Sequence, residues 1–257
     1  MGTKTKIKSV DHTQNFWIGC SKVSEGCAHC YAEKMDKVFK WTPDFRALSR
    51  TSEALWKQPF GWQKKAARTR ETDIVFGNSL SDFFHPDADQ WRAEAWETIK
   101  NTPNVVYRLT TKRAELIADR LPPDWGTGYA NVWLGATVEM KKYLWRLDTL
   151  RKIPAAAHYL AAEPLLQDLM PELADHVQGI DWVMVGGESG SQFRSMDAQW
   201  ARSIRDLCQD RGIAFWFNGH AGKHQKNTLL DGREYQKYPA LLETYKTEMS
   251  KSPIAVC

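Results

Sequence analysis

Three cysteines lie close together in one short segment of the chain. Cys20 and Cys27 are separated by six residues, and Cys27 and Cys30 by two. Cysteine thiolates are the usual ligands of iron–sulfur clusters, and three of them hold three irons of a [4Fe–4S] cube, which leaves the fourth iron to another ligand. The spacing therefore indicates a cluster with one iron open to chemistry.

Two other interpretations of these cysteines stay open. A structural zinc site usually has two paired ligand motifs, whereas this chain has one pair, and its other cysteines, Cys208 and Cys257, are distant. Cys27 and Cys30 also have the spacing of a thioredoxin-type redox pair at the start of a helix. That interpretation gives Cys20 no part.

The surrounding elements predict where the cysteines lie. Phe16–Ile18 has the apolar character of the end of a buried strand, and a helix is expected from Tyr31 to Phe39, so the cysteines fall at a strand-to-helix junction. Further apolar runs predict strands at Ile74–Phe76, Val105–Leu109, Val132–Leu134, His158–Ala161, Trp182–Val185 and Ala214–Phe217. Apolar spacings of three and four predict helices at Asp89–Lys100, Lys112–Leu121, Met140–Lys152 and Ala198–Asp210.

Strands that alternate with helices pair in parallel through right-handed crossovers. We therefore expect an α/β fold, a partial (βα) barrel of parallel strands with about six or seven βα units. The loops after the strands of such a barrel open on one face. Polar residues that follow the predicted strands should gather there around the cysteines, and they include Asn78, Ser79, Asp82, Lys112, Arg113, Thr137, Glu139, Glu163 and Glu188.

Length and composition favour one domain. The 257 residues contain no Pro-rich or Gly/Ser-rich linker, so we expect a single barrel domain over 1–257, with an insertion at 40–70 and a C-terminal extension at 219–257. The polar start of the chain and the lack of any run of 18 apolar residues predict no signal peptide and no membrane span. A cytoplasmic location follows as the expectation, and it suits reduced thiols.

A basic segment with aromatic residues runs from Lys57 to Arg70. The net charge of the chain is +4, a mild excess that permits nucleic-acid binding. Cations that neutralise phosphates and rings that stack on bases are the two components of a single-strand binding surface. An ordinary solvated helix with two anchoring rings is the alternative. The cations expected to bind nucleic acid are Lys64, Lys65 and Arg68, with Phe60 and Trp62 among them.

With these features in place, the chain resembles the radical S-adenosylmethionine superfamily, and within it a bacteriophage-associated branch of unknown function. The usual superfamily signature has three residues in the first gap between cysteines, whereas this chain has six. The resemblance covers residues 12 to 217 and weakens where the branch tends to show Lys-Gln-Trp-Gly and this chain has Asn218 to Ala221. It is carried by Trp17 to Glu33, Asn78 to Asp82, Thr111 to Arg113, Asn131 to Gly135, Glu163 to Leu166 and Val185 to Gly190.

The resemblance implies two cofactors, a [4Fe–4S] cluster held by Cys20, Cys27 and Cys30, and S-adenosyl-L-methionine bound to its open iron. Reductive cleavage of that cofactor would give a 5′-deoxyadenosyl radical, which takes a hydrogen atom from the substrate. The electron would come from a donor such as a flavodoxin or ferredoxin. His29 has the position of an aromatic residue that packs near adenine in the superfamily.

Further cofactor contacts are implied after the second and fourth expected strands. Asn78, Ser79 and Asp82 have the position of the polar groups that bind the methionine amino group, while Thr137 and Glu139 suit the ribose hydroxyls. Each of these residues has a structural alternative, because Ser and Asp also cap helices and turns.

Charged side chains at strand ends are the candidates for the substrate. Glu163 and Glu188 are the expected catalytic carboxylates and suit an amine or the N–H groups of a base. Alternatively, they form structural bridges with nearby cations. The cations expected to bind phosphate or carboxylate groups of the substrate are Arg108, Lys112, Arg113 and Arg194.

The leading hypothesis is an isomerase-type or lyase-type radical enzyme that modifies a nucleic-acid base, such as a hypermodified thymine carrying an amino-acid adduct in phage DNA, in the host cytoplasm if a phage encodes the chain. A photoproduct-lyase type of DNA repair enzyme is a second hypothesis, and it needs a hydrogen-atom donor, often a cysteine, near the barrel mouth. A third is a non-catalytic nucleic-acid-binding module with a zinc or redox cysteine loop.

Overall fold

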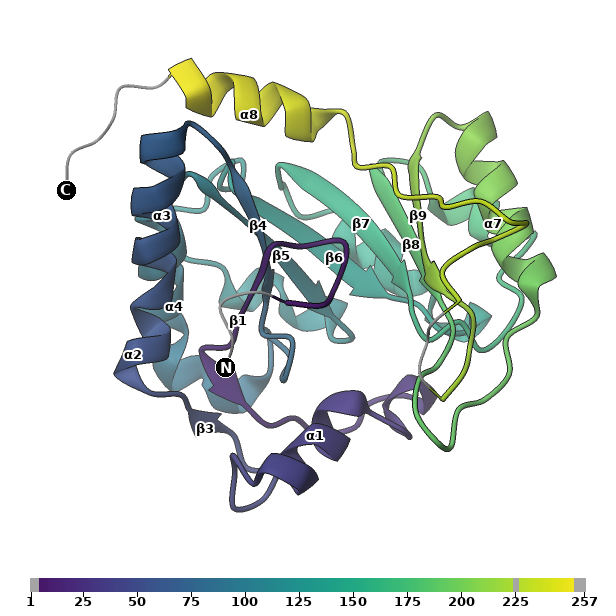
Figure 1. Cartoon of the computed structure of the whole chain (residues 1–257), viewed down its shortest axis with the longest axis horizontal. Coiled ribbons are helices and arrows are strands. Elements are labelled where there is room, and N and C mark those ends of the chain that lie inside the picture. Colours follow the sequence, from purple (N-terminus) through teal and green to yellow (C-terminus); the bar gives the residue numbers. More distant parts are fainter. Residues whose placement is uncertain (1–4, 224–226, 252–257) are drawn as a thin grey trace.

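A curled sheet of seven parallel strands dominates the computed structural model, which describes residues 5–223 and 227–251. The strand order follows the chain, as it does when each crossover advances by one strand (Figure 1). The curl makes the sheet a half-barrel, so the expected α/β fold with parallel strands is confirmed. The strands are β1 (His12–Gln14), β4 (Asp73–Gly77), β5 (Val105–Thr111), β6 (Val132–Thr137), β7 (Ala157–Ala162), β8 (Trp182–Gly186) and β9 (Ala214–Gly219).

Helices cover the convex face of the sheet (Figure 1). The main core lies beneath them, where Val75, Leu109, Leu134 and Val183 are fully buried. Strands buried on both faces read as continuous apolar runs, which is why these were visible in the sequence. The helices of the crossovers are α2 (Glu53–Trp56), α3 (Gln58–Thr69), α4 (Asp89–Lys100), α5 (Trp145–Leu150), α6 (Leu173–His176) and α7 (Ala198–Asp210), and α1 (Tyr31–Phe39) follows the cysteines as expected.

A second core fills part of the concave face. Trp133, Trp182 and Trp216 point into the half-barrel, because alternate residues of a strand face opposite sides of the sheet. The helix α8 (Leu241–Lys251) packs against them through Leu242 and Tyr245. Figure 1 shows the N-terminal segment before β1 lying in the same hollow.

The first predicted strand was wrong in its placement. The sheet begins at His12–Gln14, which pairs with β4, whereas β2 (Trp17–Ile18) leaves the sheet and pairs antiparallel with β3 (Ser49–Arg50). An edge strand is paired on one side only, so its residues need not be apolar. The apolar run after it contributes Phe16 and Trp17 to the core instead.

The helix expected over Lys112–Leu121 was also wrong. Two short 3-10 turns, Ala114–Leu116 and Ala118–Arg120, stand there. Leu121 precedes a proline and is extended, with ψ of 152°, because the proline ring disfavours helical backbone in the residue before it. The other 3-10 turns are Glu25–Cys27, Pro86–Ala88 and Lys141–Tyr143. Within the described residues, no helix combines the length and the apolar character that a membrane span requires.

Candidate functional site

The loop of residues 19–30, here called the cysteine loop, begins against the end of β4. The Gly19 amide donates to the carbonyl of Leu80 at 3.2 Å, and the Cys20 amide donates to the carbonyl of Phe45 at 2.8 Å. Gly19 has a φ of +109°, and a Cβ at this position would lie 2.9 Å from the oxygen of Phe45. Only glycine permits this conformation and this approach at low cost.

The far part of the cysteine loop lies against the end of β6. Gly26 packs directly on the carboxylate of Glu139, with its amide 3.4 Å from Oε1, and a Cβ would lie 2.9 Å from the same oxygen. Glu139 is fully buried and forms an ion pair with Arg146 at 3.0 Å. The loop therefore crosses the carboxyl ends of the central strands, as the sequence predicted.

Arg113, at the end of β5, clamps the start of the loop. Its guanidinium donates to the carbonyl and the hydroxyl of Ser21, each at 2.8 Å, and lies 3.6 Å from Sγ of Cys20. It also forms a buried ion pair with Asp82 at 3.0 Å. On the other side of the loop, the ring of His85 contacts the Ser21 hydroxyl at 2.9 Å. The Asp87 amide donates to Nδ1 of His85, so Nε2 carries the proton and donates.

Arg194 clamps the other half of the loop from the segment after β8. It donates to the carbonyl of Glu25 at 3.0 Å and pairs with Glu188. Nδ1 of His29 lies 3.0 Å from the same carboxylate. Burial would raise the pKa of Glu188, but hydrogen bonds from Arg194 and His29 lower the pKa to about 2. Glu188 is thus a carboxylate anchor that holds His29, between two of the cysteines, in place.

The three sulfurs are half-buried and free of disulfide bonds. Burial raises the pKa of the Cys20 thiol to about 12, and the nearby charge of Asp82 adds to the effect while Arg113 opposes it. Metal binding replaces the proton of such a thiol, because the ligand is the deprotonated thiolate. Burial and the neighbouring cation therefore suit Cys20 to a ligand role better than to that of a free nucleophile.

Within residues 5–223 and 227–251, no three Cys, His, Asp or Glu side chains stand close enough together to hold one metal ion. A cube of iron and sulfide takes each cysteine at a separate corner, so its ligands do not converge on a point as those of a single ion do. The donor set, three free thiols on one loop, fits such a cube in kind and number.

The residues expected to bind the cofactor lie beside the loop, and most already have protein partners. The Asp82 carboxylate accepts from Thr111 at 2.7 Å as well as from Arg113. Ser79 exchanges hydrogen bonds with Asn15. Asn78 is buried in a left-handed conformation, with φ of +55°, and its Nδ2 has no hydrogen-bond partner among the described residues.

The two residues expected to contact the ribose, Thr137 and Glu139, also have protein partners. Thr137 is buried, and its carbonyl accepts from Arg146 at 2.9 Å, while Glu139 is held as described. The proposed cofactor roles of these residues stay predictions, because partners visible here do not exclude a further ligand.

Glu163 and Asn218 meet at the carboxyl ends of β7 and β9. Asn218 Nδ2 donates to Glu163 at 2.6 Å, and the carboxylate lies over Gly186, whose missing side chain leaves it room. The Tyr31 hydroxyl reaches the carbonyl of Ser79. Its pKa is raised by burial and by the negative charges of Cys30 and Glu163. Glu163 therefore lies near the cysteine loop without being part of its clamps.

The remaining predicted cations divide between the interior and the outer surface. Arg108 is buried in the half-barrel, and Lys112 is half-buried after β5, with its amide bonded to Asp82. Lys64, Lys65 and Arg68 are exposed on α3. Lys65 pairs with Asp73, the first residue of β4. These three cations therefore lie toward the amino-terminal ends of the strands, whereas the cysteine loop lies at the carboxyl ends.

The aromatic residues of the basic segment differ in their exposure. Trp62 stacks on His12 at a centroid distance of 4.4 Å, so its ring is used in packing. Phe60 is 45% exposed. Phe60 is therefore the more accessible of the two rings, and its stacking on nucleic-acid bases stays a prediction.

Some residues of the site were missed from the sequence. His85 contacts the loop from the segment after β4, Tyr31 of α1 donates to the carbonyl of Ser79, and Arg146 fixes Glu139 from the next helix. No spacing rule places such long-range partners.

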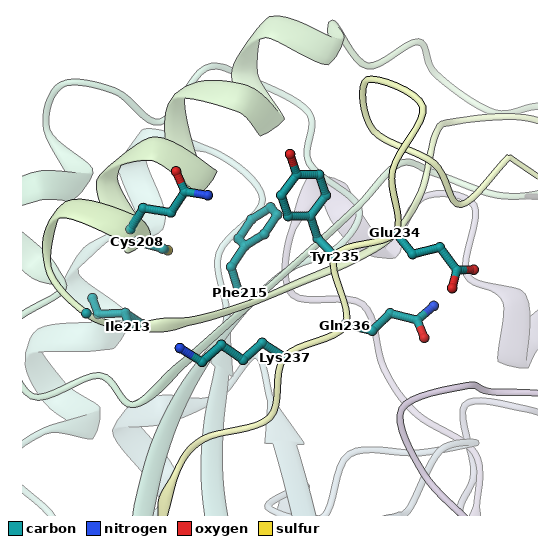
Figure 2. Close-up of a pocket in the computed structure, with 9 residues that line it drawn as sticks. Cys208, Ile213, Phe215, Glu234, Tyr235, Gln236 and Lys237 are labelled. Carbon is teal, nitrogen blue, oxygen red and sulfur yellow. The ribbon is translucent and has the colours of Figure 1, made fainter.

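A pocket of about 490 Å³ lies elsewhere, at the start of β9 (Figure 2). Cys208 lines it together with Phe215 and Tyr235, and burial raises the pKa of the Cys208 thiol to about 12. This pocket lies at the amino-terminal end of β9, whereas the cysteine loop lies at the carboxyl ends of the strands. Cys208 is thus not placed as a hydrogen-atom donor near the loop, and Cys257 lies outside the described residues.

The chain was compared with known families, curated proteins and solved structures. The family model described as "Protein of unknown function (DUF5131)" matches residues 4–239. No curated protein and no solved structure matches the chain.

Proposed function

The chain belongs to the DUF5131 family, and we propose that its cysteine loop makes it a radical S-adenosylmethionine enzyme. The observation that carries the proposal is one of position. Cys20, Cys27 and Cys30 lie on a single loop that two arginines hold across the carboxyl ends of a curled parallel sheet. This is the edge at which α/β folds place their ligands.

The protein side of the chemistry can be assigned to residues. The three cysteines would hold a [4Fe–4S] cluster. Once reduced by an external electron donor, the cluster would supply the one electron that cleaves S-adenosylmethionine to methionine and a 5′-deoxyadenosyl radical. Arg113 and Arg194 fix the loop from both sides by donating to the carbonyls of Ser21 and Glu25. Glu163, oriented by Asn218 on the interior side, would position the reacting group of the substrate.

The narrower proposal is that the substrate is a nucleic-acid base, such as a thymine that carries an amino-acid adduct in phage DNA, and that the reaction is of the isomerase or lyase type. The chain's net charge of +4 and the exposed cations of α3 support it. Those cations lie toward the amino-terminal ends of the strands, so a nucleic acid bound there would have to extend along α3 to reach the cysteine loop. A flavodoxin or ferredoxin is the proposed electron donor.

Anaerobic purification with iron and sulfide analysis tests the proposal. We expect about four irons per chain in the native protein and in Cys208→Ala, and loss of iron in Cys20→Ala, Cys27→Ala and Cys30→Ala. With a reductant, the native protein should convert S-adenosylmethionine to 5′-deoxyadenosine. Stoichiometric zinc, full iron in Cys20→Ala, or S-adenosylhomocysteine as the sole product would each overturn the proposal.

A further inference from the structure

The buried arginines of the described chain differ in their partners. Arg92, Arg113 and Arg146 each pair with a carboxylate and also donate to main-chain carbonyls. Arg108 is equally buried, with 4% of its surface exposed. Its hydrogen-bonding contacts in the described residues are the hydroxyl of Ser9 at 2.8 Å and the thioether of Met184 at 3.1 Å. Its Nε has no partner there, as in Arg92 and Arg146, so Arg108 differs from those two arginines in its lack of a carboxylate partner.

Arg108 lies on the concave face, at the middle of β5. Its guanidinium is 4.6 Å from the ring centre of Phe76, 5.9 Å from that of Tyr159 and 5.7 Å from that of Trp182. Phe76 and Thr110, on the same face, are half-exposed, so this part of the interior reaches the solvent. The aromatic rings offset part of the charge, yet they cannot replace hydrogen-bond acceptors.

Two neutral hydroxyls lie on the concave face near Arg108. The hydroxyls of Thr110 and Tyr159 hydrogen-bond to each other on the same face, and the Tyr159 ring lies across Gly135, where a Cβ would be 2.1 Å from it. Glu163 brings an opposite charge to the same interior: its charge and that of Arg108 act in opposite directions on the hydroxyl of Tyr31, whose pKa is raised mainly by burial. The interior thus has a cationic side and an anionic side.

A buried cation without a carboxylate partner is costly, because desolvation is repaid only by a well-placed opposite charge. We propose that Arg108 is the anion-binding residue of the half-barrel and that it takes a carboxylate group of the substrate. The planar fork of the guanidinium suits two carboxylate oxygens. A single cation beside neutral hydroxyls suits the one negative charge of a carboxylate better than the two negative charges of a phosphate monoester. The assignment of this carboxylate to the substrate rests on the proposed function.

The native protein tests the proposal directly. Acetate, inorganic phosphate and chloride are compared at equal ionic strength, with the melting temperature and the heat of binding as readouts. We expect acetate to raise the melting temperature with saturation, beyond the effect of chloride. No carboxylate-specific effect, or tighter binding of phosphate than of acetate, would overturn the proposal.

Substitutions separate recognition from a structural role. Arg108→Met should weaken acetate binding at least about tenfold and leave the melting temperature without acetate unchanged or raised, since an apolar side chain can replace an unpaired buried charge. Arg146→Met, the control, should lower the melting temperature because it leaves Glu139 unpaired. Arg108→Lys, which keeps the charge without the fork, should bind acetate with intermediate strength.

A lower melting temperature in Arg108→Met with unchanged acetate affinity would make Arg108 a structural residue and overturn the proposal. None of these readouts requires iron. Failure of the proposed function, seen as a protein without iron, is therefore distinguishable from failure of carboxylate binding.

Discussion

Arg113 joins Asp82 to Cys20 through one nitrogen. Its Nη1 lies 3.0 Å from Oδ2 of Asp82 and 3.6 Å from Sγ of Cys20. Both partners of this ion pair are buried: the side chain of Arg113 is 5% exposed and that of Asp82 is 8% exposed. A cation in this position offsets the negative charge of a ligating thiolate and ties the cysteine loop to the end of β5.

Replacing Arg113 by Met should destabilise the protein by about 3 kcal/mol, because the Asp82 carboxylate is left buried and unpaired. Arg202→Met, which breaks an exposed pair with Asp231, should cost less than about 1 kcal/mol. Urea unfolding measures both values. Equal costs in the two variants would contradict the role given to the buried pair.

The packing of Gly26 on Glu139 predicts a sensitive position in the loop. In Gly26→Ala the new Cβ meets a carboxylate that Arg146 prevents from moving, so the loop must shift and iron content should fall. Gly61→Ala on α3 is the control, since its Cβ meets nothing within 4 Å, and it should stabilise the helix by about 0.5–1 kcal/mol. The measurements are iron per chain and the free energy of unfolding. The same iron content in both variants would count against the importance of this packing.

The anchor formed by Glu188 should depend on pH. Its pKa in the folded protein is about 2, below the ordinary value of 4.5, so its stabilising contribution is complete above pH 4.5 and is lost as the pH falls toward 2. The native protein should therefore exceed Glu188→Gln in stability at pH 6 by more than at pH 3. Denaturant unfolding at the two pH values measures the difference, and a constant difference would refute the assignment.

Glu163→Gln keeps an oxygen that can accept from Asn218 but removes the charge. We expect substrate turnover to fall at least about tenfold, with iron content and 5′-deoxyadenosine formation in the absence of substrate near those of the native protein. Glu243→Gln, on the exposed face of α8, is the matched control. Loss of iron in Glu163→Gln would show that the carboxylate supports the loop instead of the substrate.

The cations of α3 give a test of nucleic-acid binding that is independent of the cysteine loop. Changing Lys64, Lys65 and Arg68 to Gln should weaken binding uniformly across sequences and reduce the salt slope by about 1 for each phosphate that is no longer neutralised. Iron content should not change, because these cations lie toward the amino-terminal ends of the strands, away from the cysteine loop. A salt slope equal to that of the native protein would remove these residues from the nucleic-acid surface.

The sequence by itself determined the parallel strands from β4 to β9 and the position of the cysteines at a strand-to-helix junction. Buried parallel strands are continuously apolar, and the three cysteines share a loop because they are close in the chain, so both features are visible in local sequence patterns. The edge strand His12–Gln14 escaped notice because pairing on one side places no such demand on composition.

Only the tertiary structure decided what the charged side chains do. Arg113 and Arg194 were expected to bind the substrate, which stays a prediction, and the structure shows that they hold the cysteine loop from the segments after β5 and β8, which are far apart in sequence. Arg108 lacks a carboxylate partner among the described residues, which no spacing could reveal. The reason is physical: the direction and the partners of a long charged side chain depend on the curl of the sheet, which brings together residues that are distant along the chain.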